Sequence, residues 1–146
     1  MAEQVLVDAT NHIAGRLCSY VAKMLLNGDS IVILNVEKAM LSGNKYSLIR
    51  ESHEYLETGS IINPIHGPFH ARRPDRIITR MIRGMVPRQK AKGINAMKRL
   101  RVYIGVPKNY EGKKTKEFDN AKIRKPAAYY LSVRELSKSI GWSEYD

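Results

Sequence analysis

Four arginines, Arg73, Arg76, Arg80 and Arg83, recur at intervals of three and four residues. On an α-helix this spacing places the four side chains on one face. A guanidinium group presents a planar fork of N–H donors that binds a phosphate in fixed geometry, whereas a lysine acts as a compact point charge. The spacing therefore predicts a phosphate-binding helix face. Further basic residues extend this stretch along the chain: Arg72, Arg88, Lys90, Lys92, Lys98, Arg99 and Arg101.

The positive charge of the chain is concentrated in its middle. The 146 residues include 25 Lys and Arg against 14 Asp and Glu, a net charge of +11. Residues 69–125 alone hold 18 basic and 4 acidic side chains, so the flanking parts are close to neutral. Between Phe69 and Lys108, only Asp75 opposes 12 basic residues. A solvated surface normally mixes both signs, and like charges at this density repel one another unless a polyanion neutralises them. The distribution therefore favours nucleic acid as the partner.

The side chains among these cations indicate which kind of nucleic acid is bound. Base readout uses amide side chains among the arginines, yet Gln89 and Asn95 are the only amides between residues 69 and 108. The pattern favours recognition of phosphates and shape, as in structured RNA. A DNA-binding regulator, with two basic helices joined through Gly84–Pro87, remains as the alternative. A membrane surface is disfavoured, because no amphipathic segment couples the basic face to bulky exposed apolar anchors.

The other chemically active residues are isolated rather than clustered. The sequence contains neither a phosphate-binding loop nor a dinucleotide-binding glycine motif. His66 and His70 flank Gly67-Pro68, which prevents a regular helix from pairing them as metal ligands. Cys18, the single cysteine, is expected to be buried on a helix, and Asp8 is expected to organise the turn after a strand. We expect no enzyme, no cofactor, no metal and no small-molecule substrate, although an RNA-processing enzyme that uses Asp8 and a histidine is a further hypothesis.

The N-terminal quarter has the pattern of a strand, a helix and a second strand. Val5–Val7 and Ile31–Val36 are apolar runs, the second interrupted only by Asn35, and such runs are typical of buried strands. Between them, apolar residues recur at helical spacing from about His12 to Asn27, and Thr10 or Asn11 is the expected side-chain cap. A unit of this kind predicts two parallel strands with a right-handed crossover, and therefore an α/β fold.

Beyond this unit the pattern predicts further helices and one more strand. The expected helices cover residues 46–57, 74–86, 91–99 and 132–140, and the expected strand covers residues 100–106. Residues 58–75 and 107–128 lack periodicity and are expected to be loop extensions of a single domain spanning residues 1–146. No apolar run is long enough to span a bilayer and no secretory signal is recognisable, so we expect an intracellular protein.

Three short blocks occur in order along the chain. They are Asp8-Ala9 with Gly15-Arg16-Leu17, then Leu34-Asn35 with Glu37-Lys38 and Ser42-Gly43-Asn44-Lys45, and finally Arg72-Arg73-Pro74-Asp75 with Arg83-Gly84-Met85-Val86-Pro87, Leu100-Arg101-Val102-Tyr103 and Gly105. Together they resemble the universal L-thirteen family of large-subunit ribosomal proteins, and the chain is most similar to archaeal members. The resemblance implies a three-layer α/β/α fold around a small, mainly parallel sheet of about four strands, with irregular basic extensions.

The same resemblance implies a function. Members of this family bind large-subunit ribosomal RNA without catalysis and support subunit assembly, so the implied partners are that RNA and neighbouring large-subunit ribosomal proteins. The implied location is the cytoplasm, in the ribosome. By this resemblance Arg16 and Lys45 join the expected RNA contacts. Ala14 stands where the family usually has a larger aliphatic residue, so local packing is expected to differ there.

Overall fold

The computed structural model describes residues 4–144 and has a parallel sheet at its centre. The strand order is β1-β2-β4, with bounds Gln4–Asp8, Ser30–Leu34 and Leu100–Val102. Both pairings are parallel, with Val7 opposite Ile33 and Ile31 opposite Leu100. The predicted parallel pairing of the first two strands is confirmed.

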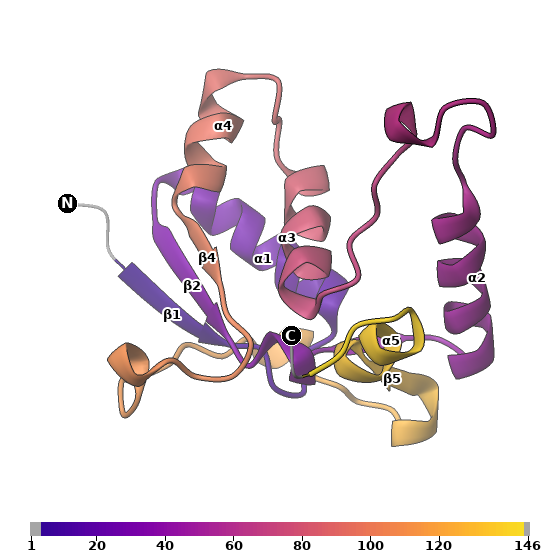
Figure 1. Cartoon of the computed structure of the whole chain (residues 1–146). Coiled ribbons are helices and arrows are strands. Elements are labelled where there is room, and N and C mark those ends of the chain that lie inside the picture. The colour runs from indigo at the N-terminus through magenta and orange to yellow at the C-terminus, as the bar shows by residue number, and fades with distance from the viewer. Residues whose placement is uncertain (1–3, 145–146) are drawn as a thin grey trace.

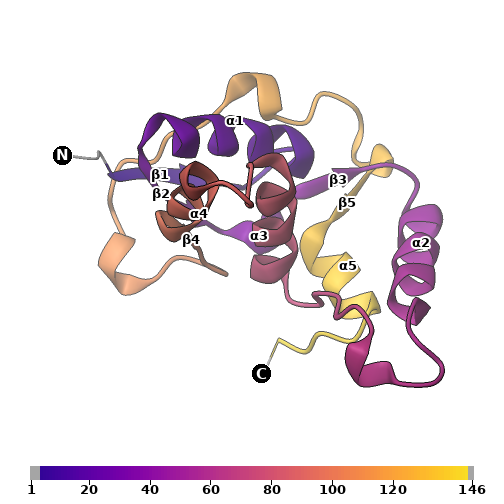
Figure 2. The same ribbon diagram turned by 90° about the horizontal axis from the view of Figure 1, so that it is seen from above.

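Helices α1, α3 and α4 cover one face of this sheet (Figures 1 and 2). Their bounds are Ala14–Asn27, Pro74–Met85 and Ala91–Lys98. The apolar stripe of α1, which includes Leu17, Val21 and Leu25, is fully buried against the strands. The helix ends at Gly28, whose φ of 115° is a left-handed conformation that favours glycine.

The other face of the sheet is covered by the irregular segment that follows β4. Leu6, Val32 and Leu34 pack there against Tyr103 and Tyr110. The segment is also tied to the sheet edge, because the Lys116 N–H donates to the Leu6 carbonyl at 2.7 Å. The α/β class and the small, mainly parallel sheet are confirmed, and the third layer consists of this basic extension with short 3-10 turns.

A small antiparallel pair lies beside the main sheet. Strands β3 (Met40–Ser42) and β5 (Tyr130–Ser132) pair there, so three parallel strands and two antiparallel ones replace the expected single sheet of about four. Helix α5 (Val133–Ser139) follows β5 directly, and the Ser132 hydroxyl accepts a hydrogen bond from the Glu135 N–H at 3.2 Å, as its sequence predicts. Helix α2 (Lys45–Glu57) follows β3.

Two predicted boundaries are wrong, each for a local reason. Neither Thr10 nor Asn11 caps α1, because the Thr10 hydroxyl donates to the Asp8 carboxylate at 2.7 Å and the cap position falls on Ile13. The strand expected over residues 100–106 ends at Val102, since the chain then turns so that the Gly105 N–H reaches the Glu37 carboxylate at 3.0 Å. Within residues 4–144, no helix has the length and hydropathy needed to cross a membrane.

Candidate nucleic-acid interface

Helix α3 separates its apolar and its basic residues onto different faces. Pro74 occupies the first helical position, where its missing N–H is not needed, and Asp75 lies in the first turn. Ile78 and Ile82 are fully buried against α1 and the sheet. Arg76, Arg80 and Arg83 are exposed because they occupy the remaining positions of the helical repeat. The helix therefore directs three guanidinium groups outward.

These arginines belong to a longer run of exposed cations, which we name the α3–α4 basic surface. Its members are Arg72, Arg73, Arg76, Arg80, Arg83, Arg88, Lys90, Lys92 and Lys98. Only Arg73 has a carboxylate partner among the described residues, Asp75 at 3.3 Å, and that pair is partly exposed. Exposed pairs of this kind contribute little to stability. The remaining eight cations have no internal counter-charge within residues 4–144.

The turn between α3 and α4 is held tightly by its own backbone. The Gly93 and Ile94 N–H groups both donate to the Lys90 carbonyl, at 3.0 and 3.1 Å. A Cβ atom at Gly93 would collide with the Pro87 carbonyl group. The glycine therefore allows the first turn of α4 to approach the Pro87 carbonyl group closely. The tight turn fixes Arg88 and Lys90 relative to both helices.

Two predicted contacts, Arg99 and Arg101, lie away from this surface. Arg99 is half-buried, and its Nη2 donates to the Leu25 carbonyl at the end of α1 at 2.7 Å. The same carbonyl accepts from the Gly28 N–H at 3.2 Å, so Arg99 adds a second, charged donor at the C-terminal end of α1 and its position is structural. Arg101 pairs in register with Val32 in the sheet, on the face opposite α3. Its Nη1 donates to the carbonyls of Lys98 and Leu100 at 3.2 and 3.0 Å.

The two residues that the resemblance added, Arg16 and Lys45, lie in separate places. Arg16, on the first turn of α1, is exposed and its Nη1 approaches the Asn120 carbonyl at 3.4 Å. Arg124 reaches the side-chain oxygen of the same asparagine at 3.5 Å, so two guanidinium groups border one shallow hollow. Sequence reasoning missed Arg124, although the basic run at 113–125 signalled it. Lys45, at the start of α2, pairs with Glu135 at 3.4 Å.

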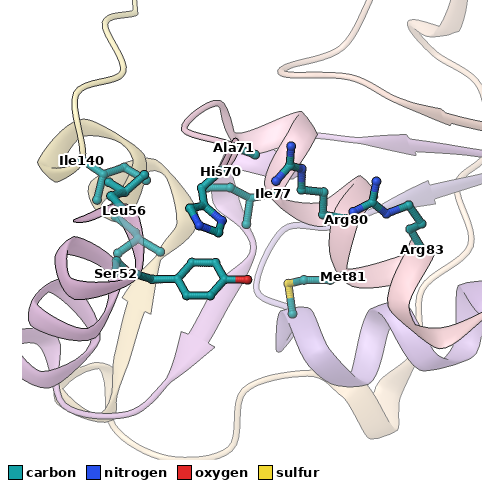
Figure 3. Close-up of a pocket in the computed structure, with 11 residues that line it drawn as sticks. Ser52, Leu56, His70, Ala71, Ile77, Arg80, Met81, Arg83 and Ile140 are labelled. Atoms are coloured by element: carbon teal, nitrogen blue, oxygen red, sulfur yellow. The ribbon is translucent and has the colours of Figure 1, made fainter. Parts of the chain in front are cut away.

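An apolar groove of about 360 Å³ borders the basic surface between α2, α3 and α5 (Figure 3). Its apolar lining includes Leu56, Ile77, Met81 and Ile140. Arg80 and Arg83 lie side by side along α3 at its edge (Figure 3). The ring of His70 packs against Tyr55 with centroids 3.8 Å apart, whereas His66 is exposed in a 3-10 turn. The two histidines therefore occupy different environments.

Asp8 and Cys18 have the structural roles that the sequence predicts. The Asp8 carboxylate accepts hydrogen bonds from the Thr10 N–H at 2.9 Å, the Thr10 hydroxyl at 2.7 Å and the Asn35 amide at 3.3 Å. Burial raises the pKa of Asp8, but these hydrogen bonds and the charge of Lys38 outweigh it, and the pKa lies below its ordinary value. Cys18 is fully buried, and burial raises the pKa of its thiol to about 12.

His12 is a further buried polar residue, and it anchors the second extension. Its Nδ1 donates to the Thr10 carbonyl at 2.8 Å, and its Nε2 accepts from the Phe118 N–H at 3.1 Å. Because a carbonyl only accepts and an amide only donates, these partners fix one neutral tautomer. Both ring nitrogens of His12 therefore have hydrogen-bond partners. Phe118 also stacks on Tyr20, with the ring centroids 5.0 Å apart. This arrangement holds the 107–128 segment on α1.

Known proteins are similar in sequence to this strongly basic α/β chain. A family model described as "Ribosomal protein L13" matches residues 2–109. The protein named "Large ribosomal subunit protein uL13" of Archaeoglobus fulgidus is 38% identical, over 93% of this chain and 86% of its own. That of Picrophilus torridus is 41% identical, over 94% of this chain and 96% of its own. That of Methanopyrus kandleri is 38% identical, over 96% and 88%.

The chain therefore belongs to the ribosomal protein L13 family, in agreement with the resemblance noted in the sequence. As a member it is a ribosomal protein of the large subunit and not an enzyme. Its location is the cytoplasm, within the ribosome. These three relatives are archaeal, which agrees with the similarity to archaeal members noted in the sequence.

Proposed function

We propose that the chain binds large-subunit ribosomal RNA through the α3–α4 basic surface and thereby supports assembly of the subunit. The observation that carries this proposal is the set of eight exposed cations that lack a carboxylate partner within residues 4–144. Unneutralised charge at this density opposes the compact state, and RNA phosphates remove that cost. Arginines on a packed helix hold their guanidinium groups in fixed positions, which suits a folded RNA.

Other basic residues have secondary roles in this proposal. Arg16 and Arg124 form a second phosphate contact, since both are exposed and their bonds to Asn120 are long enough to be exchanged for a phosphate. Lys45 contributes more weakly because Glu135 already neutralises it. Arg101 contributes from the far face of the sheet, whereas Arg99 acts inside the protein.

RNA is favoured over duplex DNA by the side chains of the basic surface. A recognition helix that reads DNA bases commonly mixes amide side chains with its arginines, and the two basic helices hold only one amide, Asn95 of α4. The exposed charged side chains of α3 are arginines, which suit phosphate contacts. Family membership adds to this argument, because the relatives are large-subunit proteins.

A binding experiment with charge-reversed variants tests the proposal. We expect the full chain to bind a folded domain of large-subunit ribosomal RNA more tightly than duplex DNA, with a log–log salt slope of about −3 to −6. Changing Arg76, Arg80 and Arg83 to Glu should weaken binding and reduce the magnitude of the slope by about 2 to 3, because roughly three phosphate contacts are lost. Circular dichroism should show an unchanged fold.

A matched control has the same change in net charge. Lys23, Arg50 and Lys138 are exposed cations outside residues 69–125, and their reversal to Glu should leave the salt slope nearly unchanged. Equal losses in the two triple variants would mean that binding depends only on net charge, and the assignment to α3 would be wrong. Tighter binding to duplex DNA would favour the DNA-binding alternative.

A further inference from the structure

The segment of residues 45–71, which we name the α2 arm, is weakly attached to the rest of the protein. It consists of α2 and the irregular chain that follows, with a 3-10 turn at Pro64–His66. No residue of α2 is buried, unlike those of the other four helices. Figures 1 and 2 both show the arm at the end of the molecule opposite β1. Most of the arm's surface is therefore exposed rather than packed against the rest of the protein.

The tip of the arm exposes large apolar side chains. Ile61 and Ile62 are each 98% exposed, Ile65 is 78% exposed and Phe69 is 71% exposed. A single exposed apolar residue is ordinary, but four within nine positions form a patch of the kind that marks an interaction site. The α2 residue Tyr55, 63% exposed, lies in the same arm. Water is therefore a poor environment for this surface.

The arm beyond Arg50 is acidic, and the two cations at its start, Lys45 and Arg50, are each paired with a glutamate. Residues 51–71 contain Glu51, Glu54 and Glu57 and no lysine or arginine, in a chain whose net charge is +11. All three glutamates are exposed. Arg50 pairs with Glu54 at 3.7 Å, so the one cation adjoining this stretch on α2 is already engaged. RNA phosphates are repelled by such a surface.

We propose that the α2 arm docks onto a second protein whose contact surface is apolar and positively charged, and not onto RNA. The inference rests on the proposed function, because the assembly supplies both the RNA and the second protein. The arm and the basic surface bind different partners according to charge. The cations on α3 and α4 face phosphate, and the arm, with its apolar tip and the exposed glutamates of α2, faces a basic protein. Charge complementarity of this kind selects partners and orients them.

Carbene footprinting with mass spectrometry tests this division in three states of the full chain. The states are the free protein, its complex with protein-free ribosomal RNA, and intact large subunits. We expect labelling of Ile61 and Ile62 to be equal in the first two states and to fall by about threefold or more in intact subunits, as a buried interface excludes the reagent. Loss of labelling with protein-free RNA, or unchanged labelling in intact subunits, would overturn the inference.

The same experiment separates this inference from the proposed function. Met85, at the end of α3, is 43% exposed and reports on the basic surface. Protection of Met85 by RNA alone, with unprotected arm residues in every state, would leave the proposed function standing and refute the arm's role. No protection at Met85 in the RNA complex would count against the proposed function instead.

A photo-cross-linking residue at Ile62 identifies the class of partner in intact subunits. We expect the cross-linked peptide to come from another protein and to carry a net positive charge. A cross-link to RNA, to an acidic peptide or to a second copy of this chain would contradict the proposal. The double variant I61S/I62S should also be removed from subunits by a salt wash about tenfold more readily than V106S, a control at an exposed valine outside both the arm and the α3–α4 basic surface. Equal removal of the two variants would likewise refute it.

Discussion

Arg99 and Lys98 are adjacent in sequence, and the structure assigns them opposite roles. Arg99 donates from Nη2 to the Leu25 carbonyl at 2.7 Å, whereas Lys98 is exposed and unpaired within residues 4–144. We therefore predict that Arg99→Met lowers the free energy of unfolding with little effect on RNA binding. Methionine retains an unbranched apolar stem, so the change removes chiefly the guanidinium group.

The size of the effect follows from the contacts of Arg99. A hydrogen bond from a charged donor contributes about 1.5–3 kcal/mol, and a cation at a helix C-terminus adds roughly 0.3–1 kcal/mol. The buried Nε of Arg99 has no hydrogen-bond partner, and removing this unsatisfied group offsets part of the loss. The net destabilisation should be about 1–2 kcal/mol, which for a domain of this size corresponds to a Tm lower by roughly 2–8 °C.

Urea unfolding and salt-dependent RNA binding of Arg99→Met and Lys98→Ala measure the two roles. Arg99→Met should shift the urea midpoint and leave the salt slope nearly unchanged. Lys98→Ala should leave the midpoint nearly unchanged and reduce the magnitude of the slope by about 0.7–0.9, one phosphate contact. If Arg99→Met retained full stability and instead reduced the slope, the internal role of this guanidinium would be refuted.

Cys18, Asp8 and Gly93 can each be tested by a single experiment. Burial raises the pKa of the Cys18 thiol to about 12, so Cys18 should resist iodoacetamide at pH 8 in the folded protein and react after denaturation. Mass spectrometry measures both reactions. Equal reaction rates in the folded and denatured protein would contradict the burial of Cys18. The pKa of Asp8 is lower in the folded protein than its unfolded value near 3.8, so the carboxylate stabilises the fold fully above that value and loses its contribution as the pH falls through the folded pKa. Asp8→Asn should therefore make the free energy of unfolding fall less steeply with decreasing pH in the acid range. An unchanged pH dependence would refute this role. Gly93→Ala should destabilise the protein by about 1–3 kcal/mol in urea unfolding, because its Cβ would overlap the Pro87 carbonyl group; wild-type stability would show that the turn relaxes.

The sequence predicts the elements whose apolar pattern is long and local. The runs that form β1 and β2, the stripe of α1 and the division of α3 into apolar and basic faces all follow from spacing alone. The Ser132 cap of α5 also follows, because the capping residue and its target lie three positions apart. In each case the residues that decide the structure are neighbours in the chain.

The elements that the sequence does not predict depend on distant partners. Strands β3 and β5 are three residues long and about 90 positions apart, so neither has a pattern of its own. The role of Arg99 depends on the end of α1, and that of Lys45 depends on Glu135. A basic residue in a basic run has the same local pattern whether it faces solvent or a distant carbonyl. The sequence alone therefore does not distinguish Arg99 from the exposed cations around it.

The central claim is that the guanidinium groups of α3 face RNA phosphate in the assembled subunit. Modification of arginines by phenylglyoxal, read by mass spectrometry, measures this directly in the free protein and in intact large subunits. Arg76, Arg80 and Arg83 should react in the free protein, where they are exposed and without a carboxylate partner among residues 4–144, and should be protected in the subunit until the RNA is digested. Arginines that remain equally reactive in the intact subunit would contradict the claim.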